Sequence, residues 1–572
     1  MKVSELPYRR LELEKFSREI EAVICSVENA KSVQEVLQAR EGYVSIVTEY
    51  QTAAALSHMR YTINTADEFY LAEKDYYDEI GPRVQNDLLR YAKAMVKSPF
   101  RRELEDGGEI IPLVFQSFEV EMKSISAEII EDMIEENKIT SEYSKLMAEM
   151  DFVFRGESMP RAMLMKYAKS EERETRKEAY AVLGKTLQVH GAQLDDIFDR
   201  LVKIRDRMAK KMGYASFVEL GDYRMGRLGY GREEISQFRD NVERDLVPVV
   251  AELRRENAKR LGVSQMKLYD HDLIIPGGDP VPVGGKAEIF KAAGAMYRDM
   301  GEDTNRFFSF MLETDAFDVE ARKNKWGGGY CTEFAAYKQP FILANFNGTS
   351  GDVDVVTHEA GHAFAAYMTA DNSFAVELNV GGMETAETHS MSMEFFAWRY
   401  MADFFGDEAK KYQYMHLMDA LSFIPYGTIV DEFQRQVYLK PEMTPAQRKE
   451  LWLELEGRFR PYVDAEGIPY LEEGTRWQYQ MHIFETPFYY IDYCLAQTAA
   501  LQFLLLSQED YADAFQRYVR LLAQGGEKVF SELLTESGLR SPFDSGALQV
   551  VSQKAQALLA KLAVEAGVSE PL

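Results

Sequence analysis

The run VDVVTHEAGHAFAAYM, residues 353 to 368, contains two histidines and a glutamate within five positions. Valines precede this charged centre and small or aromatic residues follow it, which is typical of a helix with a buried face. On a helix, His358 and His362 are four residues apart and lie on the same face. Glu359 lies about 100° further around the helix axis than His358. The stretch therefore predicts a helix that presents two imidazoles to one point, with a carboxylate beside them.

Two imidazoles that face one point are suited to hold a zinc ion, and the nearby glutamate can reach a water molecule on that ion. A catalytic zinc site usually has three protein ligands, so a third is expected from another segment. Residues 381 to 401, GGMETAETHSMSMEFFAWRYM, offer Glu384, Glu387, His389 and Glu394. The three glutamates fall on roughly one helix face because they are three and seven residues apart. Spacing alone leaves the choice of the third ligand open.

Most of the remaining sequence predicts helices. Segments such as AEIIEDMIEENKI (residues 127–139) and LDDIFDRLVKIRDRMAKKMG (residues 194–213) repeat apolar residues at three- and four-residue spacing. An exception is PFILANF, residues 340–346, which reads as a strand and follows the glycine run Gly327, Gly328 and Gly329. We therefore expect a small sheet beside the histidine helix. Residues 1–185 are almost purely helical and are expected to form an N-terminal lobe, with a catalytic region over residues 186–572.

The composition excludes some partners. Lys plus Arg is 66 and Asp plus Glu is 93, a formal net charge of −27, which repels phosphate backbones and anionic lipid. We therefore expect neither nucleic-acid nor membrane binding. The three cysteines are far apart and without a metal-binding spacing, and the first residues contain no apolar signal-peptide core. Together these features predict a cytoplasmic protein without disulfides, and they leave its oligomeric state open.

Three blocks of sequence together resemble the thimet oligopeptidase and oligoendopeptidase F family of zinc metallopeptidases. They are PFILANFNGTSGDVDVVTHEAGHAF (residues 340–364), ETAETHSMSMEFFAW (residues 384–398) and RWQYQMHIFETPFYYIDYCLAQ (residues 476–497). The chain looks most similar to the bacterial oligoendopeptidase F-like and Pz-peptidase branch. The resemblance implies a mostly α fold, a two-lobed helical shell around a deep substrate channel, with the small β-sheet beside the zinc helix.

The resemblance also assigns site residues. A Glu-x6-Glu pattern after the histidine motif selects Glu387 as the third zinc ligand, and we hypothesise that Glu394 holds a ligand histidine by its second nitrogen. The family uses a late histidine and tyrosines on substrate, which points to His482, Tyr490 and Tyr493 for catalysis. The spacing departs from the thimet branch here, so which tyrosine acts stays open. Substrate binding is expected of Tyr489, Gly328, Gly329, Ala344 and Phe346.

These assignments predict a zinc-dependent oligoendopeptidase with one Zn2+ per chain and Glu359 as general base. Its expected substrates are short unfolded peptides. The backbone of a bound peptide is expected to pair with an exposed edge of the strand PFILANF. The alternatives are an exopeptidase with the same zinc chemistry, or an inactive homologue that only binds peptides. His389 is close enough to the candidate metal site to support a metal ligand without binding the metal itself. Ordinary surface or core positions are predicted for His58, His190, His271 and His416, and apolar packing for Cys331 and Cys494.

Overall fold

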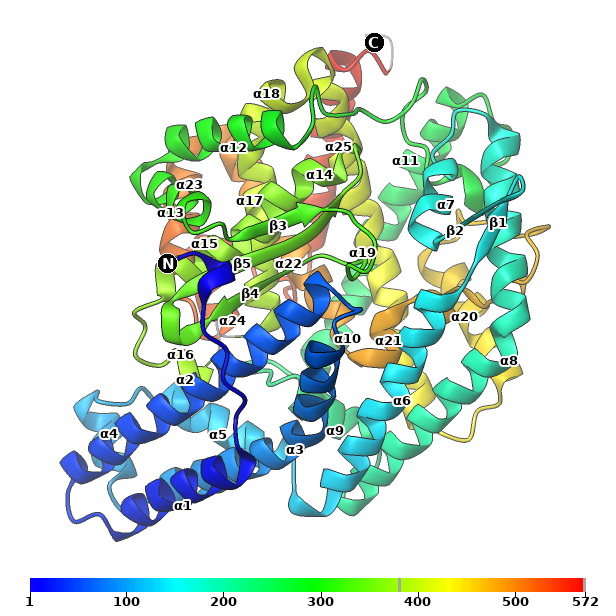
Figure 1. The fold of residues 1–572 in the computed structure, drawn as a ribbon. Coiled ribbons are helices and arrows are strands. Elements are labelled where there is room, and N and C mark those ends of the chain that lie inside the picture. The colour runs from blue at the N-terminus through cyan, green and yellow to red at the C-terminus, as the bar shows by residue number, and fades with distance from the viewer. Residues whose placement is uncertain (379–381, 569–572) are drawn as a thin grey trace.

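The computed structural model describes residues 1–378 and 382–568, and helices make up most of them (Figure 1). The first eleven helices are α1 (Leu13–Asn29), α2 (Val33–Ile63), α3 (Glu68–Lys97), α4 (Arg101–Gly107), α5 (Pro112–Ser124), α6 (Ile130–Glu149), α7 (Arg161–Tyr167), α8 (Arg173–Lys211), α9 (Phe217–Arg224), α10 (Arg232–Asn241) and α11 (Val247–Arg260). Helix α1 illustrates why they form. It buries Phe16, Ile20, Val23, Ile24 and Val27, whose three- and four-residue spacing gives one apolar stripe.

The second half of the chain carries the helices around the histidine motif. They are α12 (Lys286–Met300), α13 (Glu302–Glu313), α14 (Gly351–Asp354), α15 (Ala360–Thr369), α16 (Ala375–Leu378), α17 (Met383–Phe396), α18 (Met401–Phe405), α19 (Ala409–Leu439), α20 (Pro445–Phe459), α21 (Met481–Glu485), α22 (Tyr490–Glu509), α23 (Tyr511–Ala523), α24 (Phe530–Glu536) and α25 (Ala547–Glu565). Local chemistry fixes some of their ends. Thr444 accepts a hydrogen bond from the Gln447 backbone N–H and precedes Pro445, so α20 begins there.

The predicted small sheet is present and has three strands. They are β3 (Phe317–Glu320), β4 (Tyr330–Phe334) and β5 (Gln339–Phe346), in the order β3-β5-β4. Strand β5 pairs in parallel with β3 and antiparallel with β4. A separate antiparallel pair joins β1 (Phe152–Phe154) to β2 (Glu157–Met159). The strand expected over residues 340–346 is therefore confirmed as β5, but it is the central strand and not an edge.

Helix α15 lies between the sheet and the C-terminal helices (Figure 1). It packs against β4 and β5 on one side and against α17 on the other. Helix α17 packs in turn on α22, and α22 on α19. The helices α15, α17, α22 and α19 are therefore neighbours in that order, so residues from distant parts of the sequence meet beside the histidine helix.

Two hydrophobic cores stabilise the fold. The smaller lies among α1, α2, α3 and α5 and also includes Phe374 and Leu378, while the larger spans the rest of the chain. The predicted boundary between residues 185 and 186 falls inside α8, a single helix from Arg173 to Lys211. The division into two lobes at that position stays a prediction.

The mostly α fold with a small sheet beside the histidine helix is confirmed. Over residues 1–378 and 382–568, every helix is too short or too polar to cross a bilayer. Cys25, Cys331 and Cys494 are all free thiols, which agrees with the expectation of a chain without disulfides.

Candidate metal centre and active site

The helix that carries the histidine motif is continuous from Gly351 to Thr369 but not uniform. Helix α14 leads into a π-helical turn over Val355–Glu359, and α15 continues from Ala360. Such turns widen the helix locally and are frequent at functional sites. The sequence predicted the helix but not this turn, because apolar periodicity does not report a single wider turn.

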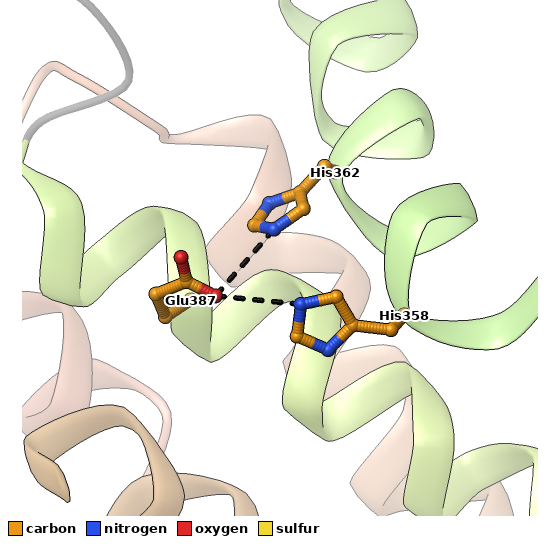
Figure 2. Close-up of side chains that lie close together, drawn as sticks. All are labelled: His358, His362 and Glu387. Atoms are coloured by element: carbon orange, nitrogen blue, oxygen red, sulfur yellow. Dashed lines mark ion pairs between the residues drawn. The ribbon is translucent and has the colours of Figure 1, made fainter. Parts of the chain in front are cut away.

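His358 and His362 point toward one oxygen of Glu387, which lies on α17 (Figure 2). Glu387 Oε2 is 3.5 Å from Nε2 of each histidine, and one ligand atom from each residue falls within 4.8 Å of the others. Ligands about 2.0–2.1 Å from a tetrahedral zinc ion would lie roughly 3.3 Å apart. The two imidazoles and the carboxylate therefore fit a zinc ion in both donor type and spacing.

Two of the other three early candidates for the third ligand, Glu384 and His389, lie outside this group of ligand atoms. Glu384 is 2% exposed, and its burial together with the charge of Asp492 raises its pKa to about 8. His389 is also buried, its Nε2 has no hydrogen-bond partner in the described chain, and burial lowers its pKa to about 3. Geometry thus separates Glu387 from residues that spacing could not exclude.

A chain of hydrogen bonds stands behind His358. Its Nδ1 is 2.5 Å from Glu394 Oε1, and the other oxygen, Oε2, is 2.7 Å from Nε2 of His416 on α19. Trp398 Nε1 donates to Nδ1 of His416 over 2.9 Å. Because an indole N–H can only donate, Nδ1 of His416 accepts and Nε2 carries the proton that faces Glu394. Glu394 thus accepts from two imidazoles and orients His358.

The prediction that His416 is an ordinary histidine is wrong. It lies on a different helix from Glu394, 22 residues further along the chain, and no spacing pattern joins the two residues. Only the packing of α17 and α19 beside α22 brings them into contact. No signal in the sequence could have found this partner.

Opposing effects set the pKa values of the two site carboxylates. Burial alone would raise the pKa of Glu387, but His362, His358 and the Tyr489 hydroxyl lower it to about 2. Burial would likewise raise the pKa of Glu394, but hydrogen bonds from His358 and His416 lower it to about 2. Both carboxylates are therefore ionised at neutral pH, and Glu394 can only accept hydrogen bonds.

Burial and a neighbouring charged group also act in opposite directions on the pKa of His358, but here burial lowers the pKa and the charged group raises it. Burial would lower its pKa, but Glu394 raises it to about 10. In the absence of metal, Nε2 therefore tends to carry a proton, and a metal ion that binds there displaces it.

A second hydrogen-bond chain stands behind His482. The Tyr426 hydroxyl donates to Gln480 Oε1 over 2.7 Å, and Gln480 Nε2 lies 2.9 Å from His482 Nδ1. Since Oε1 accepts from Tyr426, the amide nitrogen faces the imidazole and donates to it. Burial lowers the pKa of His482 to about 4, so the ring is neutral and its proton lies on Nε2. Gln480 and Tyr426, which the sequence did not single out, thus make His482 a hydrogen-bond donor.

The tyrosines beside His482 occupy different positions. The Tyr489 hydroxyl donates to Glu387 Oε1, so this residue touches the candidate ligand. The Tyr493 ring is 4.8 Å from that of Tyr489 and 5.8 Å from the His482 ring. Tyr490 packs 4.9 Å from the His482 ring and 5.9 Å from the Tyr426 ring. The predicted cluster therefore forms, and two of its members border a cavity.

This cavity has a volume of about 340 Å³ and lies directly beside the metal centre. Its lining residues are Met391, Glu394, His416, Asp419, Ala420, Phe423, His482, Tyr490, Tyr493 and Gln497. Asp419 is accessible to solvent, yet the surrounding protein raises its pKa to about 6 by desolvation. The cavity is thus open to water, as expected of a site that admits part of a flexible ligand.

The predicted strand-edge interaction needs a correction. Both edges of β5 are paired, and the Ala344 carbonyl accepts a hydrogen bond from Lys325 Nζ over 2.5 Å. Asn345 Nδ2 donates to the Gly328 carbonyl over 2.8 Å, so the glycine run is tied to β5. The edge strand beside α15 is β4, which directly follows Gly329. Contact of Gly328, Gly329, Ala344 or Phe346 with a substrate stays a prediction.

Known proteins share both the sequence and the fold. Residues 304–552 match the model of peptidase family M3, and residues 3–125 match that of the peptidase M3 N-terminal domain. The structure of Pz peptidase A with an inhibitor is 42% identical and superposes with a TM-score of 0.94, covering 98% of this chain and 99% of that one. The chain belongs to peptidase family M3.

Two further M3 relatives show how far the likeness extends. A structure from Bacillus anthracis str. Ames, assigned to oligoendopeptidase F, is 38% identical with a TM-score of 0.89 over 98% of both chains. Oligopeptidase PepF of Bacillus subtilis (strain 168) is 22% identical over 385 residues, which are 65% of this chain and 55% of that protein. The M3 chain described here is thus a peptidase, as its resemblance implied.

Proposed function

We propose that this M3 peptidase is a zinc-dependent oligoendopeptidase that hydrolyses internal bonds of short unfolded peptides. The observation that carries the proposal is the convergence of His358, His362 and Glu387, in which Glu387 Oε2 is 3.5 Å from Nε2 of each histidine and all ligand atoms lie within 4.8 Å of one another. Zinc would be held by these three residues, one ion per chain. When bound, it would lower the pKa of a water molecule and polarise the scissile carbonyl.

Glu359 is suited to be the general base. It lies next to His358 on the π-helical turn, and its carboxylate forms no hydrogen bond or ion pair with the described residues. An unengaged carboxylate can accept the proton of the attacking water and return it to the departing amine. Glu359 therefore moves the proton in both halves of the reaction.

His482 is the best placed donor for the oxygen that becomes negative during attack. Its neutral ring presents Nε2–H, because Gln480 occupies Nδ1. A preorganised donor of this kind stabilises developing charge without further reorganisation. Tyr493 lies beside His482 and borders the same cavity, and we assign it a supporting role on the substrate. Tyr490, which lines the same cavity, would contact substrate side chains.

The cavity and the composition support the substrate class. A cavity of about 340 Å³ accepts a peptide side chain but not a folded domain. The net charge of −27 disfavours nucleic acid and anionic membranes as partners. Three free cysteines fit a reducing compartment, so we propose a cytoplasmic location.

The test is cleavage of an internally quenched peptide of about ten residues with both termini blocked. The protein is assayed with and without a chelator, beside Glu359→Gln and the control Glu408→Gln, a carboxylate that pairs with Lys411 on the surface. Internal cleavage that chelation and Glu359→Gln both abolish, and that the control retains, supports the proposal. Release of single residues or dipeptides from unblocked ends alone would instead make the protein an exopeptidase. Stoichiometric metal binding without any cleavage would leave an inactive peptide-binding homologue.

A further inference from the structure

The turn that leads into α22 contains a buried phenylalanine in a left-handed backbone conformation. Phe488 has a φ of 70° and is 2% exposed. Pro487 precedes it, and the Tyr489 backbone N–H donates to the Thr486 carbonyl over 3.2 Å. Proline at the second position and a positive φ at the third are typical of a type II turn, in which the third residue is usually glycine. A phenylalanine in that conformation is strained, so its surroundings must hold it there.

Two neighbouring segments hold the backbone of Phe488 on both sides of its α-carbon. Its N–H donates to Oε1 of Gln434 on α19 over 3.2 Å, and Gln434 is itself fixed because its Nε2 donates to the Val430 carbonyl. The Phe488 carbonyl accepts from Nη2 of Arg227 over 2.6 Å, and the same nitrogen donates to Oδ1 of Asp492 over 2.9 Å. Because both flanking peptide groups are bonded to fixed partners, the left-handed conformation is imposed from outside the turn.

The ring of Phe488 fills a gap that a glycine leaves open. Gly221 lies within α9, and a Cβ atom on it would be 2.6 Å from Cδ2 of the Phe488 ring. Between ring centres, Phe488 is 5.6 Å from Tyr438 and 6.3 Å from Phe217. Burial of an aromatic ring is strongly favourable and offsets the strain of the turn. Phe488 is thus an anchor, whereas a glycine at this position would leave the turn without one.

The anchored turn places Tyr489 beside the candidate metal centre. Tyr489 directly follows Phe488, and its hydroxyl donates to Oε1 of Glu387. That bond leaves Oε2 of Glu387 facing His358 and His362, at 3.5 Å from Nε2 of each (Figure 2). Hydrogen-bond partners of a ligating carboxylate orient it and strongly affect metal affinity. A shift of the turn would therefore move this donor away from Glu387.

We propose that Phe488 is a positioning residue of the metal centre: its ring, packed against Gly221, holds Tyr489 so that Tyr489 orients Glu387 for zinc. The inference rests on the proposed zinc site and adds to it a residue that acts from outside the helices of the ligands. Phe488 acts only through Tyr489. Its effect should therefore disappear in a protein that lacks the Tyr489 hydroxyl.

The test is a double-mutant cycle with zinc affinity as the readout, measured by competition with a chromophoric chelator. Gly221→Ala adds one Cβ atom against the Phe488 ring, and Tyr489→Phe removes only the hydroxyl. Each variant should lose at least about tenfold in zinc affinity, the size expected when a metal ligand loses its hydrogen-bond partner. The double variant should lose no more than Tyr489→Phe alone, because both changes remove the same bond.

A matched control comes from Tyr470, the other buried aromatic residue with a positive φ among the residues described. Gly191 on α8 faces this residue, and a Cβ atom on it would be 2.2 Å from the Tyr470 hydroxyl oxygen. Gly191→Ala thus adds the same kind of steric contact at an anchor that is not followed by a partner of a metal ligand. It should lower the melting temperature as Gly221→Ala does and leave zinc affinity unchanged.

If Gly221→Ala fails to fold, Phe488→Leu takes its place in the same cycle, since it keeps an apolar side chain in the gap but loses the ring. Unchanged zinc affinity in either folded single variant, or losses that add in the double variant, would overturn the role of Phe488 and leave the peptidase proposal intact. A wild-type protein that binds no zinc would instead contradict the proposed function itself, and this role with it.

Discussion

His358 and His482 are the same side chain with opposite roles, and the residue behind each one makes the difference. Behind His358 stands the ionised carboxylate of Glu394, which can only accept, so Nδ1 donates and Nε2 is left for the proposed metal ion. Behind His482 stands the amide of Gln480, which donates to Nδ1, so Nε2 keeps a proton and can donate to an oxyanion. In each histidine, the hydrogen-bond partner of Nδ1 therefore decides whether Nε2 offers a lone pair or an N–H.

Exchanging the amide behind His482 for a carboxylate should give the largest effect. In Gln480→Glu, Nδ1 of His482 must donate, so the neutral ring presents a lone pair instead of an N–H. We expect kcat/KM to fall about 10²-fold at alkaline pH, the size of losing one oxyanion donor. It should recover partly at lower pH, where protonation restores Nε2–H.

Measuring pH–rate profiles of wild type, Gln480→Glu and Gln480→Leu checks this prediction. Zinc affinity serves as the control and should stay unchanged in both variants, since neither touches His358. A Gln480→Glu profile parallel to that of wild type would show that His482 does not act as a donor.

Removing the carboxylate behind His358 should weaken the metal site. In Glu394→Leu the ring loses its orienting acceptor, and zinc affinity is expected to fall about 10–100-fold. Competition with a chromophoric chelator measures this without reference to activity. Saturating zinc should restore a substantial part of the cleavage rate; unchanged affinity would contradict the role of Glu394.

Removing the hydrogen bond between Trp398 and His416, at the far end of the same hydrogen-bond chain, should have a smaller effect. Trp398→Phe keeps the packing of Trp398 but deletes the N–H that fixes the tautomer of His416. We expect zinc affinity to fall less than tenfold, since Glu394 still contacts His358. The Trp452→Phe variant is the matched control, because its indole N–H has no hydrogen-bond partner among the residues described.

The smallest effect concerns stability and contrasts two glutamates on α17. Hydrogen-bond donors keep the pKa of Glu387 at about 2, whereas burial and Asp492 raise that of Glu384 to about 8. A carboxyl with a raised folded-state pKa stabilises the fold fully below its unfolded value of 4.5, and this stability is lost as the pH rises toward 8. Glu384→Gln should therefore flatten the decline in melting temperature between pH 5 and pH 8, by roughly 1–3 °C. Parallel curves for both proteins would refute the raised pKa.

Local pattern predicted much of the fold and part of the site. The apolar stripe of α1 and the helix over His358 and His362 follow from a period of 3.6 residues, and the strand PFILANF follows from a short apolar run bounded by turn residues. The family pattern also identified Glu387, which the structure brings to the two histidines. The edge assigned to PFILANF was wrong, because strand order depends on which strands pair and not on the strand's own residues.

By itself, the sequence predicted the two histidines of the candidate metal centre and a mostly helical fold, because both depend on spacing within single helices. Glu387 was predicted from the family resemblance. Only the tertiary structure decided which groups contact Glu394 and Gln480 from behind. His416 reaches Glu394, and Tyr426 reaches Gln480, because α19 folds back beside residues that lie far from it in the sequence. Hydrogen bonds and charges act over a few ångströms in space, whereas sequence patterns report only neighbours along the chain.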